Sequence, residues 1–217
     1  MVAVYTIGQT PRPDLTIDLE NRFGRVPFEI VGALDDHSVD TLSCEPEGYP
    51  LETRLRDGTR VVVDTAFVEP LLQRAITGMD ERASVHLVSC AGLFTNLTAL
   101  KTIIQPFEVA VAELAARGVE SMEMVVPFAE QRGPALGKWQ AAGFSCRAHV
   151  LGDGPAGLSV AKWLCDRIPD TGADAVVFDY VGFPATILDE LATEIDIPVF
   201  DLGHLALDAL EGKLQTL

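Results

Sequence analysis

Short β-branched runs alternate with stretches of helical period along almost the whole chain, and this alternation restricts the fold most. The strand-like runs are residues 2–7, 28–34, 61–63, 85–88, 123–126, 146–150, 175–178 and 197–200. The stretches of helical period are residues 67–76, 107–116, 134–142, 158–168, 184–194 and 205–210. Such alternation predicts βαβ units, in which helices cover the faces of a mainly parallel sheet. The expected fold class is therefore α/β.

Residues 51–64 depart from this alternation. Asp57 and Gly58 separate two extended arms in this segment. An Asp-Gly pair between such arms is the strongest short-range signal for a β-hairpin. We therefore expect a local antiparallel excursion here.

The second half of the chain resembles a repeat of the first. A small polar turn ends a strand near residue 89, and a similar turn ends another strand about ninety residues later, near residue 179. This weak duplication predicts two pseudo-symmetric, flavodoxin-like α/β lobes with the site in the cleft between them. We expect the first lobe to span residues 1–104, joined by a C-terminal helix at 205–217, and the second to span 105–204.

Charge restricts the partners. Sixteen basic residues stand against thirty-two acidic residues, which gives a formal net charge of −16. A field of this sign repels phosphate backbones and anionic lipid, so we expect neither a nucleic-acid nor a membrane partner. A local arginine or a helix N-terminus could still bind a small anion.

The cysteines and the N-terminus indicate a cytoplasmic protein. Cys44, Cys90, Cys146 and Cys165 show no C-x-x-C spacing and form no disulfide framework. No signal peptide is visible, and the apolar runs are shorter than the ~18 residues of a membrane span. Thiols in a reducing compartment are the expectation.

Ligands of open α/β sheets bind beyond the carboxyl ends of the strands. The first such turn follows residue 7 and contains Gly8, Gln9, Thr10, Arg12 and Asp14. The planar fork of an arginine suits a carboxylate. The alternative is a rigid loop in which Thr10 or Asp14 only caps the next helix.

Cys90 ends a strand before a small-residue turn, and we expect a helix to follow it. The N-terminus of that helix would stabilise a reactive thiolate. The alternative is a buried, inert thiol, which is common for cysteine. For Cys44, in a polar loop, Cys146, at a strand start, and Cys165, on a helix, we expect inert packing.

Two further turns lie in the second half. Asp179 and Tyr180 end one strand, and we interpret Asp179 as a helix cap. The segment from Val126 to Gln131 enters a helix through Pro127, which would leave backbone N–H groups to hold an anion. We expect the Lys138 side chain at the surface and Trp139 in the core.

The remaining signals are weaker. His204 follows a strand and could reach the site, although a residue at a helix start is the simpler interpretation. Nucleotide and zinc-hydrolase motifs, such as G-x-G-x-x-G and H-E-x-x-H, are absent from the sequence. We expect no cofactor and no metal.

Three segments together resemble the AroM family. They are the opening motif T-I-G-Q-T-P-R-P-D at residues 6–14, the V-P-F-A-E-Q segment at 126–131 with Lys138 and Trp139, and D-Y-V-G-F at 179–183. The family in turn resembles the aspartate/glutamate racemase superfamily, which includes hydantoin racemases, maleate isomerases and arylmalonate decarboxylases. These enzymes have two α/β lobes and use cysteines without a cofactor or metal; two-lobed relatives also suggest a possible homodimer.

The resemblance implies roles for particular residues. Cys90 matches the cysteine of the first lobe, whereas Tyr180 stands where racemases carry their second cysteine. A phenol with a pKa of about 10 is ionised in only ~1 in 1,000 molecules at pH 7, so a symmetric two-base racemase is not expected. Tyr180 would instead donate a hydrogen bond to an enolate oxygen. The implied substrate-binding residues are Gln9, Thr10, Arg12, Ser89, Ala91, Gly92, Phe128, Gln131, Val181 and Gly182.

The expected function is cofactor-independent isomerisation, racemisation or decarboxylation of a small carboxylate, by Cys90-dependent proton transfer at carbon. Two alternatives remain open at this point. One is a hydrolase in which Cys90 acts as a covalent nucleophile. The other is a protein that binds a small carboxylate without turnover.

Overall fold

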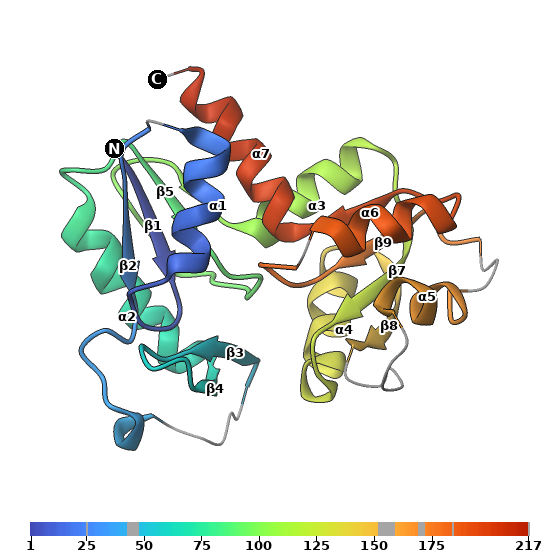
Figure 1. The fold of residues 1–217 in the computed structure, drawn as a ribbon, viewed down its shortest axis with the longest axis horizontal. Coiled ribbons are helices and arrows are strands. Elements are labelled where there is room, and N and C mark those ends of the chain that lie inside the picture. The colour runs from blue at the N-terminus through green and yellow to red at the C-terminus, as the bar shows by residue number, and fades with distance from the viewer. Residues whose placement is uncertain (25, 43–47, 152–158, 169–171, 184, 217) are drawn as a thin grey trace. The chain divides into compact units, whose positions relative to one another are not determined.

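A computed structural model describes residues 1–24, 26–42, 48–151, 159–168, 172–183 and 185–216. The chain forms two compact units (Figure 1). The first comprises Met1–Gln105 and Ala206–Leu217, and the second comprises Pro106–Leu205. Among the described residues, no helix is long and apolar enough to cross a membrane.

A parallel sheet of four strands forms the centre of the first unit. Its order is β2-β1-β5-β6. The strands are β1 (Val2–Thr6), β2 (Phe28–Gly32), β5 (Val85–Val88) and β6 (Ile103–Ile104). Every residue of β1 is buried, as expected for a central strand of a sheet covered on both faces.

The helices of this unit are α1 (Pro13–Phe23), α2 (Thr65–Met79) and the C-terminal part of α7 (Leu202–Leu214). Asp64 is the N-cap residue of α2, and its side chain accepts a hydrogen bond from the Ala66 N–H at 2.7 Å. Its buried face packs with Ala3 and Tyr5 of β1 in one hydrophobic core.

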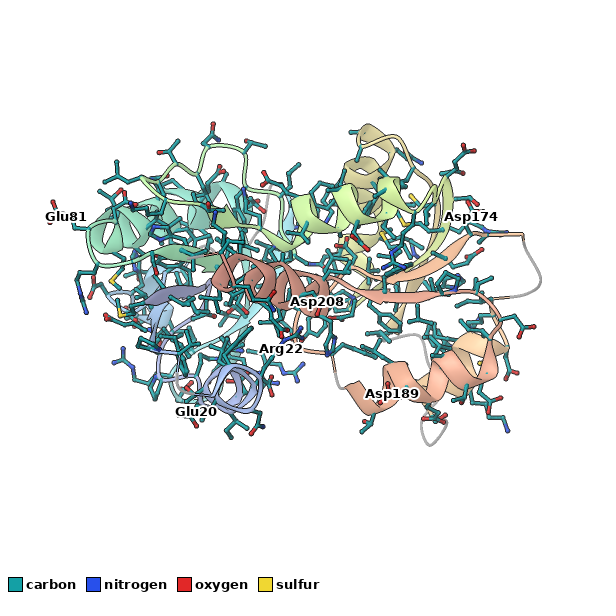
Figure 2. All side chains as sticks on the ribbon, turned by 90° about the horizontal axis from the view of Figure 1, so that it is seen from above. Glu20, Arg22, Glu81, Asp174, Asp189 and Asp208 are labelled. Carbon is teal, nitrogen blue, oxygen red and sulfur yellow. The ribbon has the colours of Figure 1, made fainter. Side chains whose placement is uncertain are left out.

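Arg22 of α1 joins the two ends of this unit. Its guanidinium pairs with Asp208 of α7 and with Glu211 at 3.1 Å (Figure 2). The C-terminal helix is therefore attached to α1 by charged side chains at the surface.

The expected hairpin is confirmed. Strands β3 (Pro50–Arg54) and β4 (Arg60–Asp64) are antiparallel, and Gly58 in the turn has a φ of +87°. The hairpin lies beyond the carboxyl ends of β1 and β2 (Figure 1), where the Gln9 N–H donates to the Arg54 carbonyl at 3.0 Å. A 3₁₀ turn, η1 (Val39–Thr41), precedes it.

The second unit has its own parallel sheet in the order β10-β9-β7-β8. The strands are β7 (Ser121–Val126), β8 (Ser145–Val150), β9 (Ala175–Phe178) and β10 (Val199–Asp201). The helical elements are α3 (Pro106–Ala116), η2 (Ala129–Gln131), α4 (Arg132–Ala141), α5 (Val160–Cys165) and α6 (Ala185–Glu194). Trp139 is fully buried against Phe107 and Phe144, with ring centroids 4.8 and 5.5 Å apart.

The α/β class with mainly parallel sheets is confirmed, while two local expectations differ from the structure. No helix follows Cys90: residues 91–102, all described, are irregular up to the two-residue strand β6. The structure also contains helix α1, which is not among the helical stretches expected from the sequence. Leu19 is its one buried residue, so the apolar periodicity that predicts a helix is weak there.

Candidate functional site

The loop that follows β1 is packed tightly against the β3–β4 hairpin. A Cβ atom on Gly8 would collide with the Arg54 carbonyl oxygen and with Thr53 Oγ1. Only glycine permits this approach. The hairpin therefore fixes the position of the residues expected to bind substrate.

Both the nitrogen and the oxygen of the Gln9 side-chain amide form hydrogen bonds within the protein. Its Nε2 donates to the carbonyl oxygens of Leu34 and His37, at 2.9 and 2.7 Å. Its Oε1 accepts the Arg56 N–H at 2.9 Å. This side chain links the β1 loop to the segment after β2 and to the hairpin. In the structure it therefore stabilises the positions of these three segments.

Thr10 is held by Asp35, which the sequence did not single out. One Asp35 oxygen accepts the Thr10 N–H at 2.7 Å, and the other accepts the Thr10 hydroxyl at 2.9 Å. The second oxygen also accepts the Gly32 N–H at 2.9 Å. A carboxylate directly after the strand-like run at residues 28–34 is the sequence signal that could have identified Asp35.

Arg12 lies at the carboxyl end of β1 and is the N-cap residue of α1, without a side-chain cap. Neither Thr10 nor Asp14 caps the helix. The Arg12 guanidinium donates to Thr6 Oγ1 at 2.8 Å and forms a two-pronged pair with Asp14, with Nη2 2.6 Å from Oδ2. Hydrogen bonds from Arg12 lower the pKa of Asp14. Arg12 is thereby held in one orientation.

Cys90 lies just beyond β5, next to the end of β1. The Ser89 N–H donates to the Tyr5 carbonyl at 2.8 Å, which fixes the backbone before Cys90 in the sheet. Cys90 is 7% exposed, and the Gly92 N–H donates to its Sγ at 3.3 Å. The expected helix N-terminus is absent, so this backbone N–H takes its place as a donor to the sulfur.

Small residues are required in this turn. A Cβ on Gly92 would lie 3.0 Å from the Phe94 ring and 3.1 Å from a methyl carbon of Leu51. Ala91 is half-buried between Cys90 and Gly92. The turn therefore keeps the Gly92 N–H at the sulfur by close packing.

The surroundings of the other described cysteines disfavour a thiolate. Burial raises the pKa of Cys146, and the nearby Asp179 carboxylate raises it further. Burial also raises the pKa of Cys165, with Glu194 adding to the shift. Cys146 lies at the start of β8 and Cys165 at the end of α5, as expected, and their inertness stays a prediction. Cys44 lies outside the described residues.

The second unit places Asp179 and Lys138 together, and both expectations for these residues are wrong. Lys138 is buried, and its Nζ lies 2.7 Å from Asp179 Oδ1, with side chains 1% and 0% exposed. The ammonium group also lies over the Phe107 ring, 4.5 Å from its centroid. Asp179 is thus not a helix cap but half of a buried ion pair. The residues are 41 positions apart in sequence, so local patterns could not pair them.

The turn after β9 carries Tyr180, Val181 and Gly182. Tyr180 packs partly against the hydrophobic core that contains Phe178 and Phe183. Gly182 has a φ of +90°, a conformation that favours glycine. The turn is therefore fixed by the Asp179 pair before it and by glycine at its end.

Phe128 and Gln131 lie in the segment after β7. Phe128 precedes η2 in extended conformation and is half-buried, and the Gln131 N–H donates to its carbonyl at 3.2 Å. Gln131 is 6% exposed. These residues share the carboxyl edge of their sheet with Tyr180 because β7 and β9 are neighbours. Among the described residues, no group of three or more His, Cys, Asp or Glu side chains could hold a metal ion.

Several solved structures share this fold. Allantoin racemase from Klebsiella pneumoniae is 20% identical with a TM-score of 0.63, and the match covers 99% of this chain and 87% of that chain. Maleate isomerase Iso from Pseudomonas putida S16 is 16% identical with a TM-score of 0.57, covering 99% and 94%. Glutamate racemase from Francisella tularensis is 13% identical with a TM-score of 0.60, covering 99% and 81%. At these identities the similarity concerns the fold alone.

No curated protein matches the sequence. The family model described as AroM protein matches residues 2–207. The resemblance seen in the three sequence segments is thereby confirmed over nearly the whole sequence, and the chain belongs to the AroM family.

Proposed function

We propose that the protein is a cofactor-independent enzyme of the racemase, isomerase or decarboxylase type, which transfers a proton at a carbon of a small carboxylate. The observation that carries this proposal is the Cys90 sulfur at the carboxyl end of β5, with the Gly92 N–H 3.3 Å away. A donated hydrogen bond favours the charged form of a thiol. The thiolate can remove a proton, and the thiol can return one.

Arg12 supplies the complementary charge for the substrate. Its guanidinium is 2.8 Å from Thr6 Oγ1. Thr6 is the last residue of β1, which pairs with β5, the strand that precedes Cys90. A substrate carboxylate could share this guanidinium with Asp14. Backbone N–H groups of the Ala91–Gly92 turn would offer further donors to the anion.

The proposed reaction proceeds in two steps. The Cys90 thiolate takes a proton from the carbon next to the carboxylate, and the C–H electrons move into an enediolate. The Cys90 thiol, after its proton exchanges with water, gives a proton to the carbon and becomes a thiolate again, which yields the exchanged or isomerised product. In a decarboxylation, loss of CO₂ generates the carbanion and the Cys90 thiol protonates it.

Proton NMR in D₂O tests the proposal. The panel contains amino acids, hydantoins, maleate and substituted malonates, incubated with the wild-type protein and with Cys90→Ala. We expect Cys90-dependent deuterium uptake, isomer formation or CO₂ loss for one class. Cys146→Ala is the matched control and should keep the wild-type rate. Turnover unaffected by Cys90→Ala, or absent from the whole panel, would contradict the proposal; the latter would favour binding without turnover.

A further inference from the structure

The hydroxyl group of Thr6 is buried at the point where β1 ends. Thr6 is the last residue of β1 and is 1% exposed. Its Oγ1 accepts the Gly8 N–H at 3.2 Å and an N–H of Arg12 Nη1 at 2.8 Å. A hydroxyl oxygen has two lone pairs, so these two bonds use its full capacity as an acceptor. One buried oxygen therefore joins the end of the strand both to the loop that follows and to the arginine.

The Arg12 guanidinium is held from two sides. Its Nε and Nη2 donate to Asp14, at 2.9 and 2.6 Å, while Nη1 donates to Thr6. A guanidinium has five N–H groups. One N–H on each terminal nitrogen of Arg12 has no acceptor among the residues that the structure describes. Two N–H groups of Arg12 are thus left for a substrate carboxylate.

The two partners hold Arg12 to different parts of the first unit. Asp14 lies in the first turn of α1, two residues after Arg12, and its side chain is 46% exposed. This pair can turn together with the start of the helix, and exposed ion pairs are weak. Thr6 belongs to β1, which pairs with β5, the strand that precedes Cys90. The Thr6 hydroxyl therefore fixes the guanidinium to the sheet that also carries Cys90.

We propose that Thr6 is a positioning residue for substrate binding: its buried hydroxyl holds the Arg12 guanidinium at the end of β1, where the guanidinium receives the substrate carboxylate. The inference rests on the proposed function, in which Arg12 binds that carboxylate. Thr6 acts through Arg12 and takes no part in the proton transfer. Loss of the hydroxyl should therefore weaken carboxylate binding and leave the Cys90 thiol unchanged.

Three variants separate the hydroxyl group from the packing of this residue. Thr6→Val keeps the branched shape of the side chain and removes the oxygen, whereas Thr6→Ser keeps the oxygen and removes the methyl group. Thr16→Val is the matched control, because the Thr16 hydroxyl donates to the backbone carbonyl of Arg12, at 3.1 Å, rather than bonding to its guanidinium. Circular dichroism and thermal unfolding establish whether each variant is folded.

The first test begins with the wild-type protein, so it stands even if Thr6→Val does not fold. ¹H–¹⁵N NMR at low temperature should show separate signals for the two terminal nitrogens of Arg12, because Thr6 and Asp14 hold them in different environments and slow their rotation. Comparison with Arg12→Lys assigns these signals. Thr6→Val should move the Nη1 signal, and Thr16→Val should leave it in place. A single averaged signal in the wild-type protein would overturn the inference.

Malonate titration followed by NMR then measures carboxylate binding in the wild-type protein and in the three variants. Thr6→Val should weaken malonate binding about tenfold, the factor that corresponds to one hydrogen bond to a charged group. Thr6→Ser and Thr16→Val should keep the wild-type affinity. Wild-type affinity in Thr6→Val, or equal losses in Thr6→Val and Thr6→Ser, would overturn the inference. A wild-type protein that does not bind malonate would also overturn it.

A kinetic measurement separates this inference from the proposed function. With the substrate class found in the D₂O panel, Thr6→Val should raise KM and leave kcat near the wild-type value, because the hydroxyl acts on binding alone. A lower kcat with an unchanged KM would overturn the inference while Cys90-dependent turnover stands. A wild-type protein without turnover would overturn the proposed function, and the malonate titration would still decide the role of Thr6.

Discussion

The two units fix the loops at the carboxyl ends of their sheets by different means. In the first, the neutral amide of Gln9 joins three segments by hydrogen bonds to backbone groups. In the second, the turn after β9 begins at a buried ion pair between Asp179 and Lys138. Neutral hydrogen bonds each contribute modestly, whereas a buried charge that loses its partner is very costly. Loss of a single hydrogen bond should therefore destabilise the first loop only modestly, whereas loss of one charge of the pair should destabilise the second loop strongly.

The largest expected effect comes from breaking the buried pair. Lys138→Met should lower the free energy of unfolding by about 3–5 kcal/mol, because the Asp179 carboxylate is left buried without its countercharge. Urea unfolding followed by circular dichroism measures this loss. Unchanged stability in this variant would contradict the view that the pair organises the turn.

Two variants sharpen this result. Arg60 forms an exposed pair with Glu52 at 3.0 Å and is 61% exposed, so Arg60→Ala should cost less than ~1 kcal/mol. Replacing both buried charges, as in Lys138→Met with Asp179→Leu, should recover much of the lost stability. A double variant as unstable as the single one would show that packing, not charge, is responsible.

The second prediction concerns Gln9. Gln9→Ala should lower the free energy of unfolding by about 2 kcal/mol, because the Leu34 carbonyl and the Arg56 N–H lose a partner. Chemical denaturation compared with Lys138→Met gives the test. A loss as large as that of Lys138→Met would remove the distinction between the two loops.

The third prediction concerns the buried His86 of the first unit and the pH dependence of stability. His86 Nδ1 lies 2.7 Å from the Tyr5 hydroxyl, and Nε2 lies 3.2 Å from Asp80 Oδ1. Burial lowers the pKa of His86 below its usual 6.5 and raises that of Tyr5. The unfolded chain then binds the proton first, so stability should fall as pH drops below about 6.5.

The pH slope of stability measures this linkage. One proton accounts for at most about 1.4 kcal/mol per pH unit. His86→Gln should flatten the slope between pH 7 and the folded pKa, since the remaining groups titrate in both proteins. The same slope in both proteins would show that His86 does not titrate on unfolding.

The smallest expected effect belongs to Asp14, the exposed partner of Arg12. Its side chain is 46% exposed, so Asp14→Asn should change stability by less than ~1 kcal/mol. It should instead release Arg12 and alter carboxylate binding, which malonate titration by NMR can measure. Because the Asp14 pKa is lowered, its small contribution is lost as pH falls below about 3.8. Unchanged malonate binding would contradict the assignment of Arg12.

Local sequence patterns predicted those helices, strands and turns that depend on residues adjacent in the sequence. The Asp57–Gly58 turn and the buried Trp139 follow directly from sequence. The parallel sheets follow from the alternation of runs. Helix α1 was missed because a single buried residue, Leu19, gives little periodicity. Proline at its first position fixes the start instead.

The sites depend on contacts between distant residues, which explains what was missed. The sequence predicted Lys138 at the surface because its partner, Asp179, lies just after β9 and far from α4 in the sequence. Asp35 binds Thr10 across 25 positions. Cys90 was singled out correctly as a strand-end residue, but the donor to its sulfur is the Gly92 N–H and not a helix. Its reactivity stays a prediction.

The most direct test of the central claim is the rate at which iodoacetamide alkylates each cysteine near neutral pH, read by peptide mass spectrometry. Thiolate is the reactive form, and burial raises the pKa of Cys146 and Cys165. We expect Cys90 to react far faster than these two cysteines and malonate to slow its reaction. Equally slow alkylation of all the cysteines would contradict a reactive Cys90 thiolate.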